Sequence, residues 1–194
     1  MIIGVDEVGR GCIAGDLLVC AFSVRPGISR EDMDELRAVS MDSKAFKSRK
    51  GRTKADLVCR KHGLFELRRA SPSVIDELNI RGATLWAMRE AAVALAARLG
   101  VETEVLFDGK DVPEGMKIPC RAVIKGDASV LEISAASIIA KVARDAELEK
   151  AALDYPGYGF EQHAGYGTKA HRAAIAELGL CAIHRSWARK FLTA

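Results

Sequence analysis

The first eleven residues place an apolar strand directly before two adjacent carboxylates and a glycine-flanked arginine. Residues 2–5, Ile-Ile-Gly-Val, have the character of a buried strand. Asp6 and Glu7 follow it, where ionised carboxylates are costly unless a cation or hydrogen bonds compensate them. In a regular strand their side chains point to opposite faces. Taken alone, the pair also fits an exposed charged turn after an edge strand, so the rest of the chain has to decide.

The composition is that of an ordinary globular chain. It has 194 residues, 49% of them hydrophobic, and a net charge of +3. We expect one domain over residues 1–194, with a small helical part at about 154–194. The five cysteines are scattered without a Cys-x-x-Cys pair, which indicates a reducing compartment without zinc or a disulfide framework. The sequence shows no secretory signal or membrane span, so we expect a cytoplasmic protein. We also expect a monomer.

Positive charge is concentrated in a basic segment, residues 44–61. This segment contains eight basic residues and a single acid, Asp56. A solvated helix face and a phosphate-contacting surface explain this segment equally well, because a cluster of basic residues is compatible with nucleic-acid binding but does not prove it.

Hydrophobic periodicity and caps divide the chain into strands and helices. The strand at 17–24 should return antiparallel to the first, because a short glycine-containing connection joins them. Ser29 and Thr168 are predicted helix N-caps, and Gly100 should end a long helix. The other predicted strands lie at 65–69, 104–107 and 121–124, and the predicted helices at 30–36, 53–62, 72–79, 84–99, 134–145, 168–177 and 186–192, with an ordered loop at 154–167.

Four carboxylates share one property, because each comes at the end of a predicted strand. Asp6 and Glu7 follow the first strand, and Asp108 and Asp127 follow two later ones. Like charges gathered at one edge of a sheet repel one another unless cations intervene. Oxygen ligands without a nearby histidine pair favour Mg²⁺ or Mn²⁺ over zinc, and carboxylate clusters near basic residues are typical of two-metal phosphoryl-transfer sites. The pattern predicts phosphodiester hydrolysis.

Other catalytic motifs fail on spacing. Gly9, Gly11 and Gly15 are one residue too far apart for the dinucleotide fingerprint, and there is no Gly-Lys-Ser/Thr phosphate loop. The histidines lack metal-type pairing, and no serine or cysteine nucleophile signature occurs. We interpret Ser134 and Ser137 as helix-packing residues.

Taken together, these motifs resemble bacterial ribonuclease HII, the type 2 ribonuclease H that cuts RNA paired with DNA and nicks DNA at embedded ribonucleotides. The resemblance runs in the family's order from residue 4 to residue 186. The matching blocks are residues 4–11, Asp42-Ser43-Lys44, Asn79-Ile80, Asp108-Gly109, Lys125-Gly126-Asp127, residues 133–145, Tyr158-Gly159-Phe160, His163-x-Gly165-Tyr166 and His184-Arg185-Ser186.

The resemblance implies a ribonuclease H-like α/β fold, with a central mixed sheet flanked by helices and a C-terminal helical extension. Asp6, Glu7, Asp108 and Asp127 would form an acidic tetrad around two divalent ions, Mg²⁺ or Mn²⁺. Hydrolysis would leave 5′-phosphate and 3′-hydroxyl ends. The expected partners are RNA–DNA hybrids and ribonucleotide-containing duplex DNA, without a membrane.

The resemblance also implies how substrate is recognised. Main-chain groups of the turn at residues 9–11 would read the ribose 2′-hydroxyl, because glycine has no side chain in the way. A tyrosine would pack on the sugar of the following deoxynucleotide and bond to the same hydroxyl. The substrate-binding residues would be Gly9, Arg10, Gly11 and Tyr166 at the sugars, with Ser43, Lys44 and Lys141 at phosphates.

The chain departs from the family pattern at four positions. The family commonly has proline after Gly11 and again near position 16, where this chain has Cys12 and Asp16, so we do not expect the turn to have the rigidity that proline would give it. Ala45 and Ala164 stand where lysine is usual. The two alanines predict fewer phosphate contacts, a flatter salt dependence and weaker affinity at high salt, with cleavage specificity retained.

Two rival interpretations and one ambiguous carboxylate remain. A ribonuclease HIII-like enzyme typically has threonine in place of Arg10 and an extra N-terminal domain, which we do not expect because the first strand begins at residue 2. A non-catalytic nucleic-acid-binding module would use the basic segment and keep the acids as structure. Asp145 lies one helical turn from Lys141, so we expect an ion pair there and not a metal ligand.

Overall fold

The computed structural model describes residues 1–41 and 48–192 and contains a five-stranded mixed sheet. Its strands are β1 (Ile2–Val8), β2 (Leu17–Val24), β3 (Gly63–Ala70), β4 (Glu104–Asp108) and β5 (Cys120–Val123). In space their order is β3-β2-β1-β4-β5, which places β1 in the middle. β2 is antiparallel to β1, as predicted, and also to β3, whereas β4 is parallel to β1 and β5.

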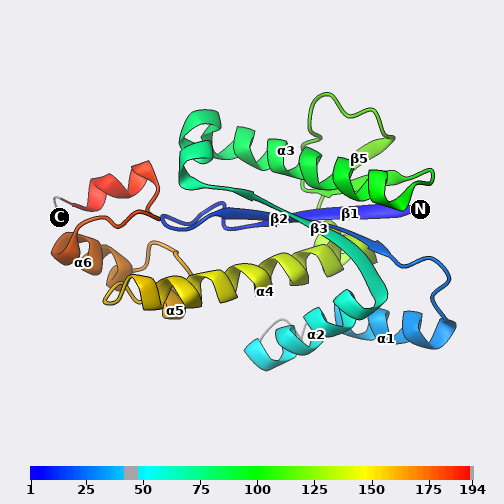
Figure 1. Ribbon diagram of the computed structural model, residues 1–194, viewed down its shortest axis with the longest axis horizontal. Coiled ribbons are helices and arrows are strands. Elements are labelled where there is room, and N and C mark those ends of the chain that lie inside the picture. Colours follow the sequence, from blue (N-terminus) through cyan, green and yellow to red (C-terminus); the bar gives the residue numbers. More distant parts are fainter. Residues whose placement is uncertain (42–47, 193–194) are drawn as a thin grey trace.

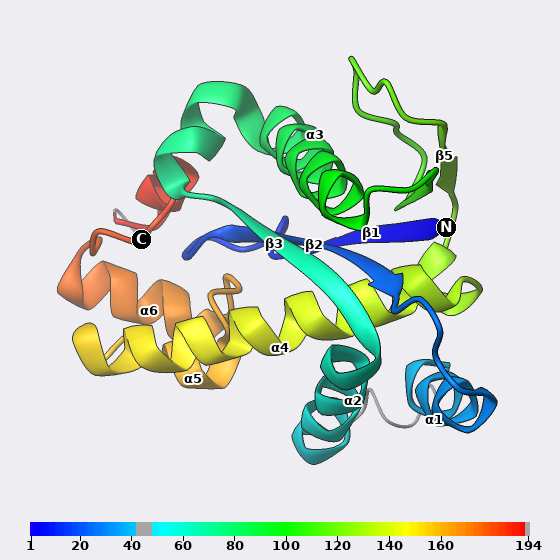
Figure 2. The ribbon, with the colours of Figure 1, turned by 45° about the vertical axis from the view of Figure 1, so that its right-hand side comes forward.

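Helices cover both faces of this sheet. They are α1 (Arg30–Ser40), α2 (Arg49–His62), α3 (Pro72–Leu99), α4 (Leu131–Asp154), α5 (Phe160–His163) and α6 (Lys169–Leu178), with the 3₁₀ helices η2 (Gly126–Ala128) and η3 (Ser186–Phe191). α3 lies on one face, and α4 with α1 and α2 lies on the other (Figure 1). The turned view shows α5, α6 and η3 gathered at the end of the molecule opposite the N-terminus (Figure 2).

Side-chain alternation along β1 divides the core into two layers. Ile3 and Val5 are fully buried in the cluster that includes α3. On the other face, Gly4 lies against the first turn of α4, and a Cβ there would fall 2.2 Å from the main-chain carbon of Glu132. Small residues of α4 such as Ala136, fully buried, continue this close packing. The predicted approach of a small-residue helix to the sheet is therefore confirmed.

Local capping signals located several helix ends, although α1, α2 and α4 extend beyond their predicted bounds. The Ser29 hydroxyl accepts the N–H of Asp32 at 3.1 Å, and the Thr168 hydroxyl accepts the N–H of His171 at 3.3 Å. Gly100 ends α3 in the left-handed conformation. These three predictions are confirmed.

α3 is longer than predicted because two predicted helices join across a kink. Asn79 has φ 55° and ψ 168°, which is not helical. Its side-chain oxygen accepts the N–H groups of Arg81 at 3.0 Å and Gly82 at 3.1 Å, so it caps the second helical part from within the chain.

The C-terminal part also differs from the prediction. α4 continues to Asp154, and within this extension Leu148 is buried against Ile13 and neighbouring apolar residues. The loop predicted at 154–167 contains the short helix α5. The last predicted helix is the 3₁₀ helix η3.

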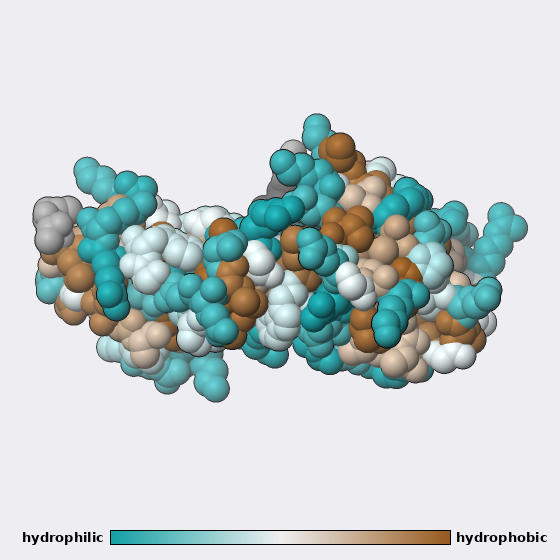
Figure 3. Space-filling model, turned by 90° about the horizontal axis from the view of Figure 1, so that it is seen from above, coloured by the Kyte–Doolittle hydropathy of each residue, from teal (hydrophilic) through white to brown (hydrophobic). Residues whose placement is uncertain are grey.

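The surface seen from the α3 side mixes hydrophilic and hydrophobic residues, and its outline is indented between the two ends (Figure 3). Within residues 1–41 and 48–192, no helix combines the length and the apolar character that a membrane crossing requires. The single domain, the monomeric state and the cytoplasmic location stay predictions.

Candidate active site

β1 remains paired through Val8 and carries Asp6 and Glu7 on opposite faces. Asp6, 6% exposed, receives a hydrogen bond from Ser137 of α4, and its Oδ1 accepts the N–H of Glu7 at 2.7 Å. Glu7 lines a cleft on the α3 side and pairs with Arg10 at 3.2 Å. The predicted alternation is confirmed. Our interpretation of Ser137 as a packing residue was incomplete, because its hydroxyl contacts the buried carboxylate.

Asp108 lies at the end of the neighbouring parallel strand, and its charge acts on both Asp6 and Glu7. Asp108 Oδ1 accepts the N–H of Gly126 at 2.7 Å and that of Asp127 at 3.4 Å. The side chain of Asp127 is exposed. The structure thus brings the four predicted carboxylates to one edge of the sheet, with Asp127 attached through its main chain.

The charges of this edge are incompletely compensated by the protein. Burial raises the pKa of Asp6 to about 8; the hydrogen bond from Ser137 opposes this rise, and the charges of Glu7 and Asp108 add to it. Burial also raises the pKa of Glu7, against the hydrogen bond and charge of Arg10. Carboxylates in this state are suited to a hard divalent cation, which would favour their ionised form.

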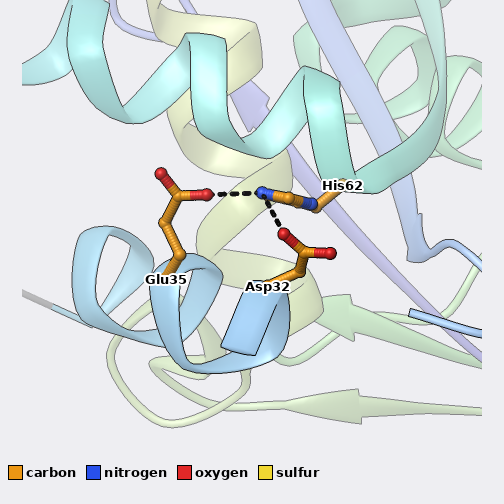
Figure 4. Close-up of side chains that lie close together, drawn as sticks. All are labelled: Asp32, Glu35 and His62. Atoms are coloured by element: carbon orange, nitrogen blue, oxygen red, sulfur yellow. Dashed lines mark hydrogen bonds and ion pairs between the residues drawn. The ribbon is translucent and has the colours of Figure 1, made fainter. Parts of the chain in front are cut away.

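The predicted carboxylates are nevertheless not drawn into a tight ligand trio. Among the residues that the structure describes, the trio of metal-type ligands within 4.8 Å of one another is Asp32, Glu35 and His62, between α1 and α2 (Figure 4). His62 Nε2 lies 2.6 Å from Glu35 Oε2 and 3.8 Å from Asp32 Oδ1. Lys61 also pairs with Glu35 at 3.2 Å. Contacts within the protein therefore account for this trio as a link between two helices.

A cleft of about 150 Å³ opens beside the carboxylates on the α3 side. Glu7 and Asp108 line it together with the cations Arg10, Arg81 and Lys110. A larger cavity, of about 860 Å³, lies elsewhere, near the start of β1. The volume of a cavity alone therefore does not identify the predicted catalytic site.

On the α4 side, the predicted sugar-binding residues adjoin one another. A Cβ at Gly11 would lie 3.9 Å from the Tyr166 ring, and Cys12 and Tyr166 form an isolated antiparallel bridge. Tyr166 is 43% exposed. It lines a second cleft, of about 320 Å³, together with Lys141. This cleft brings a predicted phosphate contact beside a predicted sugar contact.

Acids of α4 partly neutralise the basic segment where it borders this second cleft. Lys141 pairs with Asp145 at 2.6 Å, as predicted. Arg52 approaches the same carboxylate at 3.8 Å, and Arg49 pairs with Glu149 at 2.6 Å. The predicted contacts Ser43 and Lys44, and the departure Ala45, lie outside the described residues.

Comparisons with known proteins agree with one another. The family model described as Ribonuclease HII matches residues 3–192. A ribonuclease HII from Halorhodospira halophila is 42% identical over 95% of this chain and 89% of its own length. Another, from Maricaulis maris, is 43% identical over 95% of this chain and 79% of its own length.

Solved structures share the fold. Ribonuclease HII from Archaeoglobus fulgidus, in a complex with PCNA, superposes with a TM-score of 0.74 at 25% identity, over 96% of this chain and 92% of that one. Bst-RNase HIII in complex with Mn²⁺ superposes with a TM-score of 0.72 at 15% identity, over 98% of this chain and 64% of that one, which shows the fold alone. The predicted ribonuclease H-like α/β fold is confirmed.

Proposed function

The chain belongs to the ribonuclease HII family, a family of ribonuclease H endonucleases, and from that premise we propose its finer specificity and its site. It hydrolyses the RNA strand of RNA–DNA hybrids and nicks duplex DNA on the 5′ side of embedded ribonucleotides. The products carry 5′-phosphate and 3′-hydroxyl ends. The supporting observation is the buried Asp6, whose pKa is raised by the charges of Glu7 and Asp108 and which lies three residues before the glycine-flanked turn beside Tyr166.

Asp6, Glu7, Asp108 and Asp127 are proposed to hold two divalent ions, Mg²⁺ or Mn²⁺. Their fit rests on the donor set, which consists of oxygens, and on the incomplete compensation of their charges within the protein. When bound, the ions would stabilise charge on the attacking and leaving oxygens of the phosphodiester.

The protein's own groups keep these carboxylates oriented. Ser137 and the N–H of Glu7 bind Asp6, so its oxygens have fixed directions. Two main-chain N–H groups bind Asp108 in the same way. Side chains held by such hydrogen bonds lose little freedom when they act on substrate.

Substrate choice is proposed to depend on sugar chemistry and backbone contacts. Gly9, Arg10 and Gly11 present main-chain groups to a ribose 2′-hydroxyl, and the exposed ring of Tyr166 packs on the adjoining sugar. Lys141, in the same cleft as Tyr166, contacts a phosphate. Base readout plays little part in this recognition.

The decisive experiment maps the cut on a DNA strand that contains one ribonucleotide and is paired with DNA. With Mg²⁺ or Mn²⁺ we expect a single nick on the 5′ side of the ribonucleotide, and phosphatase sensitivity should identify the 5′-phosphate. An all-DNA duplex is the control. A duplex that stays intact with both ions, or a cut displaced from the ribonucleotide, would contradict the proposal.

The rival interpretations receive little support. Ribonuclease HIII structures match this chain at 15–19% identity and therefore show the fold alone. A non-catalytic nucleic-acid-binding module does not agree with membership of a nuclease family.

A further inference from the structure

Two arginine side chains are fully buried beside the turn that follows β1. We call residues 9–16 the selector turn. Arg144 of α4 and Arg185, which precedes η3, are both 0% exposed. Within residues 1–41 and 48–192, neither forms an ion pair with a carboxylate. A buried charge is costly unless hydrogen bonds satisfy it. The hydrogen-bond partners of the two guanidinium groups therefore indicate the role of each arginine.

Arg185 donates hydrogen bonds to three main-chain carbonyls of the selector turn. Its Nε binds Gly15 O at 2.9 Å, and its Nη1 binds Cys12 O at 3.1 Å and Arg10 O at 3.3 Å. The guanidinium also lies over the Trp187 ring, with Cζ 5.4 Å from the ring centroid. One side chain thus holds both halves of the turn.

Arg144 holds the same turn from the α4 side. Its Nη2 binds Ala14 O at 3.0 Å, its Nε binds Asp16 O at 3.1 Å, and its Nη1 binds Ala164 O at 2.7 Å. Gly9 has φ +95°, and a Cβ there would lie 2.4 Å from Arg144 Nε. The first glycine of the turn therefore packs directly on the guanidinium.

Main-chain hydrogen bonds complete this arrangement. The N–H of Ile13 binds Gly165 O at 2.9 Å, and the N–H of Gly15 binds Ile183 O at 2.8 Å. The N–H of Arg185 in turn binds Ile13 O at 2.9 Å. The selector turn is consequently enclosed by residues that neither belong to it nor carry a predicted catalytic carboxylate.

We infer that Arg144 and Arg185 are positioning residues for sugar selection: they bind the carbonyls of the selector turn and so fix the main chain of residues 9–11 against the ribose. The inference rests on the proposed function. A guanidinium suits this task because its planar set of donors binds several carbonyls at once, whereas a lysine ammonium is a compact point charge. Small displacements of such a main-chain site weaken its discrimination.

The test compares two substrates within one enzyme preparation. One duplex carries a single ribonucleotide, and the other carries a 2′-fluoro nucleotide at the same position, which cannot donate a hydrogen bond. The ratio of the two kcat/KM values does not depend on how much of the protein is folded. For Arg185→Lys we expect this ratio to fall by about tenfold or more, because the main-chain partner of the 2′-hydroxyl moves.

Arg144→Lys is the second variant, with the same expected direction. Arg121→Lys is the matched control, since Arg121 is an exposed arginine that pairs with Glu104 on β4. If cleavage by a variant is too slow to measure, the ratio of dissociation constants for the ribonucleotide duplex and its all-DNA counterpart serves instead.

The outcomes separate the two proposals. Ratios equal to that of the wild type in both variants, with activity on the two substrates falling in parallel, would leave Arg144 and Arg185 a structural role and overturn the inference. A wild-type protein that does not cut the ribonucleotide duplex would overturn the proposed function, and this inference with it.

Discussion

Two regions with buried charged side chains adjoin at the end of β1. One contains carboxylates whose charges are incompletely compensated by the protein, and the other contains two arginines that bind main-chain carbonyls. Asp6 lies beside further carboxylates, and burial raises its pKa to about 8. Arg185 lies behind the selector turn, and burial lowers its pKa to about 10. Near neutral pH the carboxylate can gain or lose a proton, whereas the guanidinium stays charged. We therefore expect the carboxylate edge to respond to added cations. The two arginines instead bind main-chain carbonyls, and among the described residues only Nη2 of Arg185 is a buried side-chain polar atom without a hydrogen-bond partner.

The largest expected effect tests the carboxylate edge. Asp108→Asn should lower kcat on a ribonucleotide duplex by at least about a thousandfold, because it removes a charge needed to hold a divalent ion. Substrate affinity, measured by fluorescence anisotropy, should persist. Asp34→Asn, at an exposed position on α1, is the control. Unchanged turnover in Asp108→Asn would remove this residue from the site.

Removing the guanidinium of Arg185 tests the region around the selector turn. Arg185→Met should lower the free energy of unfolding by about 3–5 kcal/mol, because it removes the donors of three main-chain carbonyls of the selector turn, two of them in buried hydrogen bonds. Urea unfolding followed by circular dichroism measures the change. A loss below about 1 kcal/mol would show that water or other donors replace the arginine.

Asp6→Asn, in contrast, should raise the free energy of unfolding relative to the wild type at alkaline pH in the absence of divalent ions. The folded-state pKa of Asp6, about 8, exceeds its ordinary value of 3.8, so the folded protein holds the extra proton between these values. The associated stability is complete below about pH 4 and is lost as the pH rises through about 8, with a slope of at most about 1.4 kcal/mol per pH unit.

Thermal unfolding across this pH range measures the effect. The wild type should lose stability between pH 5 and pH 8 relative to Asp6→Asn, and Mg²⁺ or Mn²⁺ should restore it at the upper end. Parallel profiles of the two proteins would contradict the proposed state of Asp6.

The smallest effect concerns the rim of the second cleft. Ala164→Lys should steepen the dependence of log Kd on log salt by about one unit, because it restores one phosphate contact. Val93→Lys adds the same charge on the exposed surface of α3 and should change the slope less. Equal slopes for the two variants would place Ala164 away from the nucleic acid.

Much of the fold could be predicted because its signals are local. A run of apolar residues, a capping serine or a terminal glycine acts within a few positions, so β2 and the caps at Ser29 and Thr168 agree with the sequence. The kink at Asn79 could not be predicted in this way. Its side chain competes with the helix for the same main-chain groups, and the outcome depends on packing.

The candidate site likewise combines residues that local sequence signals reveal with residues that only the fold brings together. Strand ends revealed Asp6 and Asp108, since parallel strands finish at one edge. The contacts of Arg144 and Arg185 with the selector turn join residues more than 125 positions apart, which no spacing rule connects. These contacts also supply an origin for the rigidity that prolines at Cys12 and Asp16 would have given.

The bond from Arg185 to Arg10 O spans 175 positions of the chain. During synthesis the carboxylate strand leaves the ribosome early, but the selector turn cannot take its final shape until residues 164–185 have also emerged. A growing or truncated chain that ends between residues 127 and 164 therefore contains all four predicted catalytic carboxylates but lacks the contacts that Gly165, Ile183 and Arg185 make with the selector turn.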